Sequence, residues 1–305
     1  MTLSVQFSAD LRQWLLAHLE RGSTPAALVQ EMVAHRMEPR AAQAIVDAFV
    51  LARKTGRPAP ADSVPLYDPQ TDYRPGPWRL PGDALLDLGD RQVPVLTRLE
   101  RPRVAVLENV FSAEECEQLI AAARSRLKPS TITDPKSGHN VVREHRSSEG
   151  MFFRLNESPL LQRLDARAAA VSSLPVENGE GFQILHYRPG AQNTPHFDFL
   201  LPAHAANQAS LARSGQRLST LIVYLNDVEA GGETTFPEAG LSVRPRRGNA
   251  VYFEYCDAQG GLDALSLHAG APVIAGEKWI ATKWMRERRF VSASEAGAEG
   301  VSYSH

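Results

Sequence analysis

Two features are scarce in this chain of 305 residues, and each absence excludes a class of protein. The only cysteines, Cys116 and Cys256, lie far apart and match no metal or redox spacing. A disulfide framework is therefore not expected, which fits a reducing compartment. No stretch is long and apolar enough to span a bilayer, and the first apolar run, 11–19, is interrupted by polar residues, unlike a signal peptide. We expect a cytoplasmic protein.

An excess of charge is also missing. The formal net charge is -2, which gives no reason to expect nucleic acid or an anionic membrane as a partner. The composition, 43% hydrophobic and 22% charged, is ordinary for a globular protein. The length suits one large domain with a smaller one.

The N-terminal part predicts a small helical module, residues 1–60. Ser8 is a candidate cap for a first helix, Thr24 and the following Pro25 begin a second, and Pro39 begins a third that ends near Gly56. Two interpretations stay open. The module either packs as a structural unit, or it docks a protein or peptide substrate.

Residues 61–100 are predicted to be an extended linker rich in Pro and Gly, followed by the first strands. Ser112 and Glu115 form a capping box that begins a helix. The polar segment 128–146 lacks any period and is interpreted as a mobile loop. Residues 291–305 look like a disordered tail.

The main domain, residues 101–290, is predicted to be mainly β with flanking helices. After residue 181 short β-branched runs alternate with turn signals, for example LSTLIVYL before Asn226 and Asp227. Many short strands with frequent turns favour a sandwich or barrel, and most of all a double-sheet jelly roll.

His196 and Asp198 are the residues around which the chemistry is organised. Residues i and i+2 of an extended backbone point to the same face, so both side chains can bind one ion. With a second histidine they would form the two-His, one-carboxylate triad of non-haem Fe(II) oxygenases. Alone, such a triplet is weak evidence.

His268 is the candidate second histidine, and Lys278 follows ten residues later. A lysine that points into a barrel needs an anionic partner, because an unpaired buried ammonium is too costly. A dicarboxylate bound to the metal would supply one. The order of these residues predicts Fe(II) that binds 2-oxoglutarate and O2, with Lys278 holding the far carboxylate of 2-oxoglutarate. Lys283 is the competing anchor.

Several segments resemble the prolyl 4-hydroxylase-type family of Fe(II)/2-oxoglutarate dioxygenases. The resemblance covers about residues 103–290 and departs from the family pattern at Asn193, where a tyrosine is frequent, and at Ala191, where a glutamine is common. The segments that carry it are YRPGAQNTPHFDF, TLIVYLNDVEAGGETTFP, SLHAGAPVIAGEKW and, upstream, RSSEGMFF.

The resemblance implies a distorted double-stranded β-helix in which His196, Asp198 and His268 hold Fe(II) and Lys278 anchors 2-oxoglutarate. It also implies that Tyr187 hydrogen-bonds this cosubstrate, and that ascorbate supports turnover by re-reducing the iron. The activity it implies is hydroxylation of a C–H bond, foremost in a prolyl residue of a peptide or protein, with release of succinate and CO2.

Two further residues are candidates for binding substrate. Arg146 either points into the cleft or is a surface arginine, and Trp284 either lines the cleft or packs in the core. Three alternative functions stay open: a hydroxylase of a free amino acid or small metabolite, a metal-containing sensor or binding protein, and a zinc hydrolase. A zinc hydrolase would have no use for Lys278.

Overall fold

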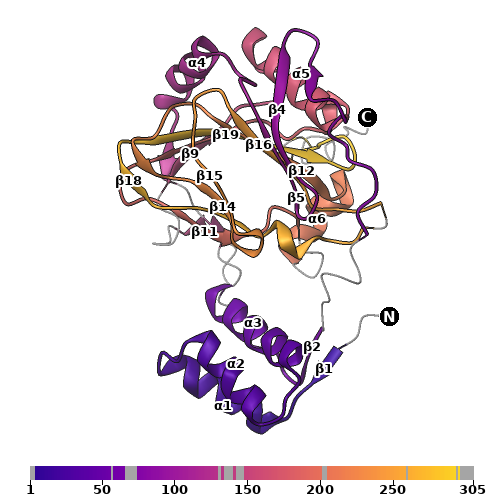
Figure 1. The fold of residues 1–305 in the computed structure, drawn as a ribbon, viewed down its shortest axis with the longest axis vertical. Coiled ribbons are helices and arrows are strands. Elements are labelled where there is room, and N and C mark those ends of the chain that lie inside the picture. Colours follow the sequence, from indigo (N-terminus) through magenta and orange to yellow (C-terminus); the bar gives the residue numbers. More distant parts are fainter. Residues whose placement is uncertain are drawn as a thin grey trace, which may run out of the picture. The chain divides into compact units, whose positions relative to one another are not determined.

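The computed structural model describes most of the chain in two units, shown as ribbons in Figure 1. One unit consists of residues 1–72 with 132–141, and the other of residues 73–131 with 142–305. Each has its own apolar core. The described residues are 4–55, 58–65, 74–129, 132–133, 140–141, 148–200, 205–258, 260–292 and 295.

The smaller unit contains the three predicted helices. The hydroxyls of Ser8 and Thr24 accept hydrogen bonds from the backbone N–H groups of Leu11 and Ala27, so both predicted caps are present. Two short strands that pair antiparallel were not predicted. The elements of this part are α1 (Ala9–Glu20), α2 (Pro25–Ala34), α3 (Pro39–Thr55), β1 (Ser4–Gln6) and β2 (Ser63–Pro65).

A large and a small antiparallel sheet form the core of the larger unit, which confirms the predicted mainly β jelly roll. The large sheet has nine strands in the order β3-β4-β5-β16-β12-β19-β10-β9-β6. Their bounds are β3 (Leu85–Asp87), β4 (Gln92–Leu99), β5 (Arg103–Leu107), β16 (Ala250–Glu254), β12 (Arg217–Tyr224), β19 (Lys278–Arg286), β10 (Gln183–Tyr187), β9 (Glu149–Phe152) and β6 (Lys128–Pro129).

The small sheet has four strands in the order β11-β17-β14-β15. Two further pairs, β13 with β18 and β7 with β8, stand outside both sheets. The bounds are β11 (Asn193–His196), β17 (His268–Gly270), β14 (Thr234–Phe236), β15 (Leu241–Val243), β13 (Ala230–Gly231), β18 (Val273–Ala275), β7 (Ile132–Thr133) and β8 (Asn140–Val141).

The large sheet separates two apolar cores. One face packs against α4 (Ala113–Arg124) and α5 (Pro159–Ser172), and Leu119 and Ile184 belong to this core. The opposite face contributes Leu185 to a second core, which the small sheet completes. Successive residues of a strand point to opposite faces, so Ile184 and Leu185 fall into different cores.

The helix starts follow local rules. Ser112 and Glu115 form the predicted capping box of α4, with both reciprocal hydrogen bonds present. Helix α6 (Ala205–Ser214) was not predicted from the sequence. Short 3-10 helices span Val176–Asn178, Pro237–Ala239 and Ala264–Ser266. Among the described helices, none combines the length and apolar character that crossing a bilayer requires.

The end of the predicted linker is bound to the larger unit. The buried carboxylate of Glu254 accepts hydrogen bonds from the backbone N–H groups of Arg79 and Leu80, at 2.8 and 3.2 Å. Asp257 accepts another from the N–H of Arg74. Residues 74–80 therefore belong to the larger unit.

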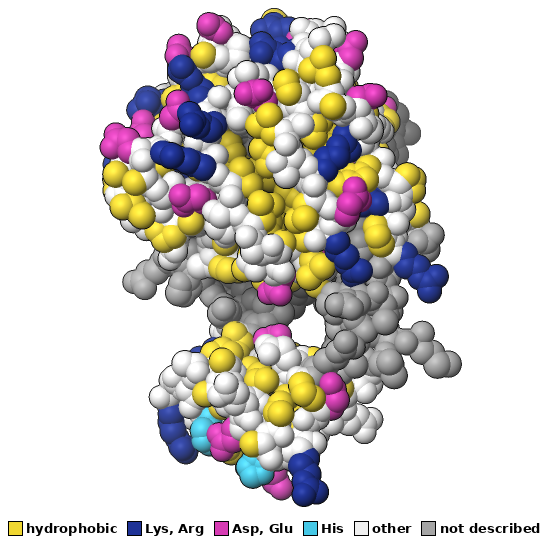
Figure 2. Space-filling model, viewed as in Figure 1, with side chains coloured by type: hydrophobic (Ala, Val, Ile, Leu, Met, Phe, Trp, Pro, Cys, Tyr) yellow, Lys and Arg dark blue, Asp and Glu magenta, His cyan; other side chains and the backbone are white. Residues whose placement is uncertain are grey.

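The prediction for segment 128–146 is only partly tested. Residues 128–129 are strand β6 of the large sheet, and β7 pairs with β8, so these positions are not irregular loop. Arg146 and most of the predicted tail 291–305 lie outside the described residues. Figure 2 shows apolar side chains gathered in the middle of one face of the larger unit, with charged side chains around its edge.

Candidate metal and cosubstrate site

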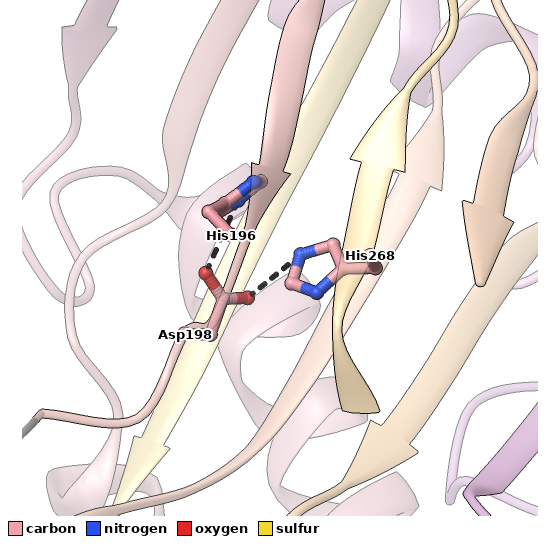
Figure 3. Close-up of side chains that lie close together, drawn as sticks. All are labelled: His196, Asp198 and His268. Carbon is pink, nitrogen blue, oxygen red and sulfur yellow. Dashed lines mark ion pairs between the residues drawn. The ribbon is translucent and has the colours of Figure 1, made fainter. Parts of the chain in front are cut away.

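The three predicted metal ligands lie together between the two sheets (Figure 3). His196 ends β11 and His268 begins β17, and these residues are cross-strand partners. Asp198 follows in the irregular segment after β11. One ligand atom from each of the three residues lies within 4.8 Å of the others.

Backbone carbonyls fix both imidazole rings. Nδ1 of His196 lies 2.9 Å from the carbonyl oxygen of Thr194, and Nδ1 of His268 lies 3.0 Å from that of Ser266. A carbonyl oxygen only accepts hydrogen bonds, so each Nδ1 carries the proton and each Nε2 keeps a lone pair for a metal. Both Nε2 atoms face Asp198, at 3.7 Å from Oδ1 for His196 and 3.5 Å from Oδ2 for His268.

Asp198 is buried and ionised. Burial alone would raise the pKa of this carboxyl group, but electrostatic interactions with His268, His196 and Arg217 and a hydrogen bond from Thr220 lower its pKa to about 2. The Thr220 hydroxyl donates to Asp198 Oδ2 at 2.8 Å and lies 3.1 Å from the hydroxyl of Tyr255. A carboxylate held in this way is ready to bind a cation without reorienting.

The first residue of β12, Arg217, and the preceding Gln216 also hold the backbone that carries Asp198. The side-chain amide of Gln216 makes two 2.7 Å hydrogen bonds with the N–H and C=O of Leu200. Arg217 Nη1 donates to the Asp198 carbonyl oxygen at 3.3 Å, and the same guanidinium forms a bidentate pair with Glu180. The irregular segment after β11 is thereby fixed from the neighbouring sheet.

A pocket extends from the three ligands between the sheets. Lys278 lines it, is 2% exposed, and has no carboxylate within ion-pair distance among the described residues. Burial lowers the pKa of Lys278 to about 8, while the charge of Glu233 acts in the opposite direction. An unpaired buried ammonium of this kind is suited to an anionic ligand.

The competing lysine is on the opposite face of β19. Lys283 Nζ lies 2.6 Å from Asp165 Oδ1, and both side chains are almost completely buried. Lys283 is thus already paired and outside the pocket. His186 also faces away from the pocket, since its two ring nitrogens lie 3.1 Å from Glu149 and 2.8 Å from Glu277.

Tyr187 and Trp284, predicted from the sequence, both line the pocket. Tyr187 is the cross-strand partner of Lys278, whose Nζ lies 5.4 Å from the centre of the tyrosine ring. Trp284 stacks against Arg217, whose Cζ lies 4.0 Å from the indole centre. Arg146 lies outside the described residues, so its role stays a prediction.

Sequence reasoning missed the polar residues Thr220, Gln183 and Thr234. Thr220 bonds to Asp198, and the other two line the pocket. Thr220 carried a sequence signal, because it is a polar residue within the strand-like run LSTLIVYL, two positions before Ile222, which lines the pocket. Gln183 and Thr234 carry no comparable pattern.

Comparisons with known proteins agree with this geometry. Residues 182–286 match the model of the 2OG-Fe(II) oxygenase superfamily. Prolyl 4-hydroxylase 1 of Arabidopsis thaliana is 42% identical over 202 residues, covering 61% of this chain and 70% of that protein. Probable prolyl 4-hydroxylase 7 of the same plant is 38% identical over 223 residues, covering 66% and 69%.

A solved structure is also similar. The viral collagen prolyl hydroxylase of Paramecium Bursaria Chlorella virus-1, in its 2OG complex, has 29% identity and a TM-score of 0.48, covering 60% of this chain and 95% of that one. The sequence relatives and the family model establish the family that the residues of the pocket indicated. The chain belongs to the prolyl 4-hydroxylase-type family of Fe(II)/2-oxoglutarate dioxygenases, and it is an oxidoreductase.

Proposed function

We propose that this protein hydroxylates prolyl residues within peptides or proteins. One oxygen atom of O2 enters the C–H bond of the substrate, and the other enters 2-oxoglutarate, which leaves as succinate and CO2. One observation carries the proposal: a single pocket contains an open two-His, one-carboxylate set and, apart from it, an unpaired buried lysine. The names of the relatives support the prolyl substrate.

The donor set fits Fe(II). The Nε2 atoms of His196 and His268 and the carboxylate of Asp198 would hold the ion, and these are the ligand types of the two-His, one-carboxylate Fe(II) sites. Bound there, Fe(II) would supply the redox chemistry that activates O2. The chain's own contribution is to hold His196, Asp198 and His268 in place through Thr220 and the two backbone carbonyls.

Lys278 is proposed to bind the far carboxylate of 2-oxoglutarate, with Tyr187 beside it. The apolar side chains of Leu185, Ile222 and Ile280 line the same pocket as Lys278 and the metal ligands and exclude water from it. Lys278 thereby orients the cosubstrate. The apolar lining keeps water away, so that the oxidation takes place on the bound substrate.

Trp284 is proposed to contact the substrate, as is Arg146. Ascorbate is proposed as the reductant that restores Fe(II), a property that rests on the family resemblance alone. The cytoplasmic location also stays a prediction. It is consistent with Cys116 and Cys256, which are both buried as free thiols.

The test is hydroxylation of peptides by the purified protein with Fe(II), 2-oxoglutarate and ascorbate. We expect a prolyl peptide to gain the mass of one oxygen atom, with one succinate formed for each hydroxylation. His196→Ala should bind no iron and form no product while remaining folded. Hydroxylation of free proline in place of peptides would contradict the proposal. Omitting ascorbate should shorten the progress curve.

A further inference from the structure

The lysine that lines the pocket lies at the end of a strand, where the pairing on one side runs out. Lys278 is the first residue of β19, and it pairs with Tyr187 of β10. On the other side, the residue pairs with β12 end at Ile280, and one further main-chain bond joins the Leu225 N–H to the Trp279 carbonyl oxygen. The main chain around position 278 therefore lies beyond the strand pairs on this side, and strand ends open more readily than strand centres.

The side chain of Asn226 takes the place of the missing strand. Its Oδ1 accepts a hydrogen bond from the backbone N–H of Trp279, and its Nδ2 donates to the carbonyl oxygen of Glu277, both at 2.7 Å. Nδ2 also donates to the carbonyl oxygen of Asp227 at 2.9 Å. These partners fix which way the amide points, because carbonyl oxygens require a donor and an N–H requires an acceptor. Asn226 thus holds the residue before and the residue after Lys278.

Holding this strand end matters because of the charge it carries. Lys278 is 2% exposed and has no carboxylate within ion-pair distance among the described residues. Burial of such an ammonium is unfavourable, so opening of the strand end would let it reach water. The two bonds from Asn226 oppose this movement. An ammonium held in the pocket before the ligand arrives leaves less ordering to be done on binding.

The aliphatic stem of Lys278 is enclosed by the same loop, residues 226–232. A Cβ atom on Gly232 would lie 3.3 Å from Cδ of Lys278 and 3.4 Å from Cγ1 of Val228. The absence of a side chain at position 232 therefore leaves the room that the lysine stem occupies. The N–H of Gly232 donates to the carbonyl oxygen of Pro272 at 2.9 Å, which fixes this part of the loop. One loop thus confines both the main chain and the stem of Lys278.

We propose that Asn226 is a positioning residue for 2-oxoglutarate, which holds the main chain on both sides of Lys278 and keeps the ammonium in the pocket. This inference rests on the proposed function, in which Lys278 binds the far carboxylate of 2-oxoglutarate. Asn226 is not one of the described residues that line the pocket, so it acts on binding through Lys278.

The experiment compares two ligands that differ only at the end that Lys278 binds. 2-Oxoglutarate and 2-oxopentanoate share the same 2-oxoacid carbon chain, but the second has a methyl group in place of the far carboxylate. Their affinities for the full-length protein are measured by calorimetric titration, with Co(II) in the metal site and without O2. Asn226→Ala should weaken 2-oxoglutarate binding about tenfold, the effect of one or two lost hydrogen bonds, and leave the affinity for 2-oxopentanoate unchanged.

Asn178 supplies a matched control at the opposite end of the same strand. Its Nδ2 donates to the carbonyl oxygens of Arg286 and Glu287, at 3.1 and 3.2 Å, and Arg286 is the last residue of β19. Asn178→Ala therefore removes the same kind of side-chain bond to β19, away from Lys278. Both variants should lower the Tm, but only Asn226→Ala should reduce the preference for 2-oxoglutarate.

The outcomes separate this inference from the proposed function. Equal weakening of both ligands in Asn226→Ala, or no weakening of either, would overturn the positioning role and leave Lys278 as the anchor. The same loss of preference in Asn178→Ala would also overturn it, because general loosening of β19 would then be the cause. Wild-type protein that binds both ligands equally would contradict Lys278 as the anchor, and this part of the proposed function would fail together with the inference.

Discussion

Strand β19 carries one buried lysine on each face, and among the described residues only one of the two has a carboxylate partner. On the helix-covered face, Lys283 is paired with Asp165 at 2.6 Å. On the face toward the small sheet, Lys278 is equally buried but has no carboxylate partner among the described residues. A paired buried charge belongs to the fold, whereas an unpaired one indicates a missing anion. The difference separates a structural lysine from a binding lysine on one strand.

Breaking the structural pair should have the largest effect on stability. Lys283→Ala leaves Asp165 as an unpaired buried carboxylate, so we expect a loss of about 3–5 kcal/mol in the free energy of unfolding, measured in urea. The affinity of the folded protein for 2-oxoglutarate should be unchanged. Replacing both partners, as Lys283→Met with Asp165→Leu, should recover most of the stability. An unchanged free energy of unfolding in Lys283→Ala would mean that the pair does not stabilise the fold.

Removing the binding lysine should give the converse result. Lys278→Ala should weaken 2-oxoglutarate binding by about 2–5 kcal/mol, which is roughly thirtyfold to several thousandfold. Stability should not fall, because the variant removes an unpaired buried ammonium. Lys278→Arg should be milder but not silent, since its planar guanidinium replaces a compact charge. Calorimetric titration of the metal-loaded protein without O2 measures these affinities. Unaltered binding in Lys278→Ala would remove the main support for this anchor.

The hydrogen bond from Thr220 to Asp198 in the same pocket should also strengthen metal binding. Thr220→Val keeps the side-chain shape but loses the hydroxyl that donates to Asp198 Oδ2. We expect about a 10- to 100-fold loss in affinity for Co(II), a spectroscopic substitute for Fe(II), titrated by its visible absorption. Tyr255→Phe, one hydrogen bond further out, should have a smaller effect in the same direction. Equal affinities in all three proteins would exclude a positioning role for Thr220.

Lys278 should give 2-oxoglutarate binding a pH dependence that Lys283 does not. Without the ligand the pKa of Lys278 is lowered to about 8, so the ammonium is lost as the pH rises through this value. The carboxylates of 2-oxoglutarate stay ionised, so affinity should fall above pH 8 by up to about tenfold per pH unit. Lys278→Arg stays protonated and should flatten this part of the profile. A flat wild-type profile between about pH 7 and 10 would contradict the assignment.

The smallest effect is expected from removing the helical module. A chain that begins at Tyr73 keeps the hydrogen bonds of residues 74–80 to Glu254 and Asp257, so it should still bind iron and decarboxylate 2-oxoglutarate. A chain that begins at Pro81 loses these bonds and should have a lower Tm. If a folded chain that begins at Tyr73 lost iron binding, the helical module would have to contribute to the metal site.

The fold was predictable where local patterns are strong. The capping box at Ser112 and the β-branched run before Asn226 indicated their elements directly. Helix α6 was missed because its sequence, AANQASLARS, has no clear apolar stripe. For the site, residue types and order indicated His196, Asp198, His268 and Lys278. Gln183 and Thr234 became visible only through strand register, which joins positions far apart in the sequence.

The carbonyl bonds that orient the two histidines determine which neighbouring substitutions the site tolerates. The acceptors are main-chain oxygens of Thr194 and Ser266, and every amino acid provides one. The exposed side chain of Thr194 is therefore free to vary without loss of ring orientation, whereas Ser266 is buried and its hydroxyl donates to the carbonyl oxygen of Asp263. What must be preserved is the backbone path, which makes insertions or deletions between residues 194 and 196, or between 266 and 268, far more damaging than a point substitution at 194.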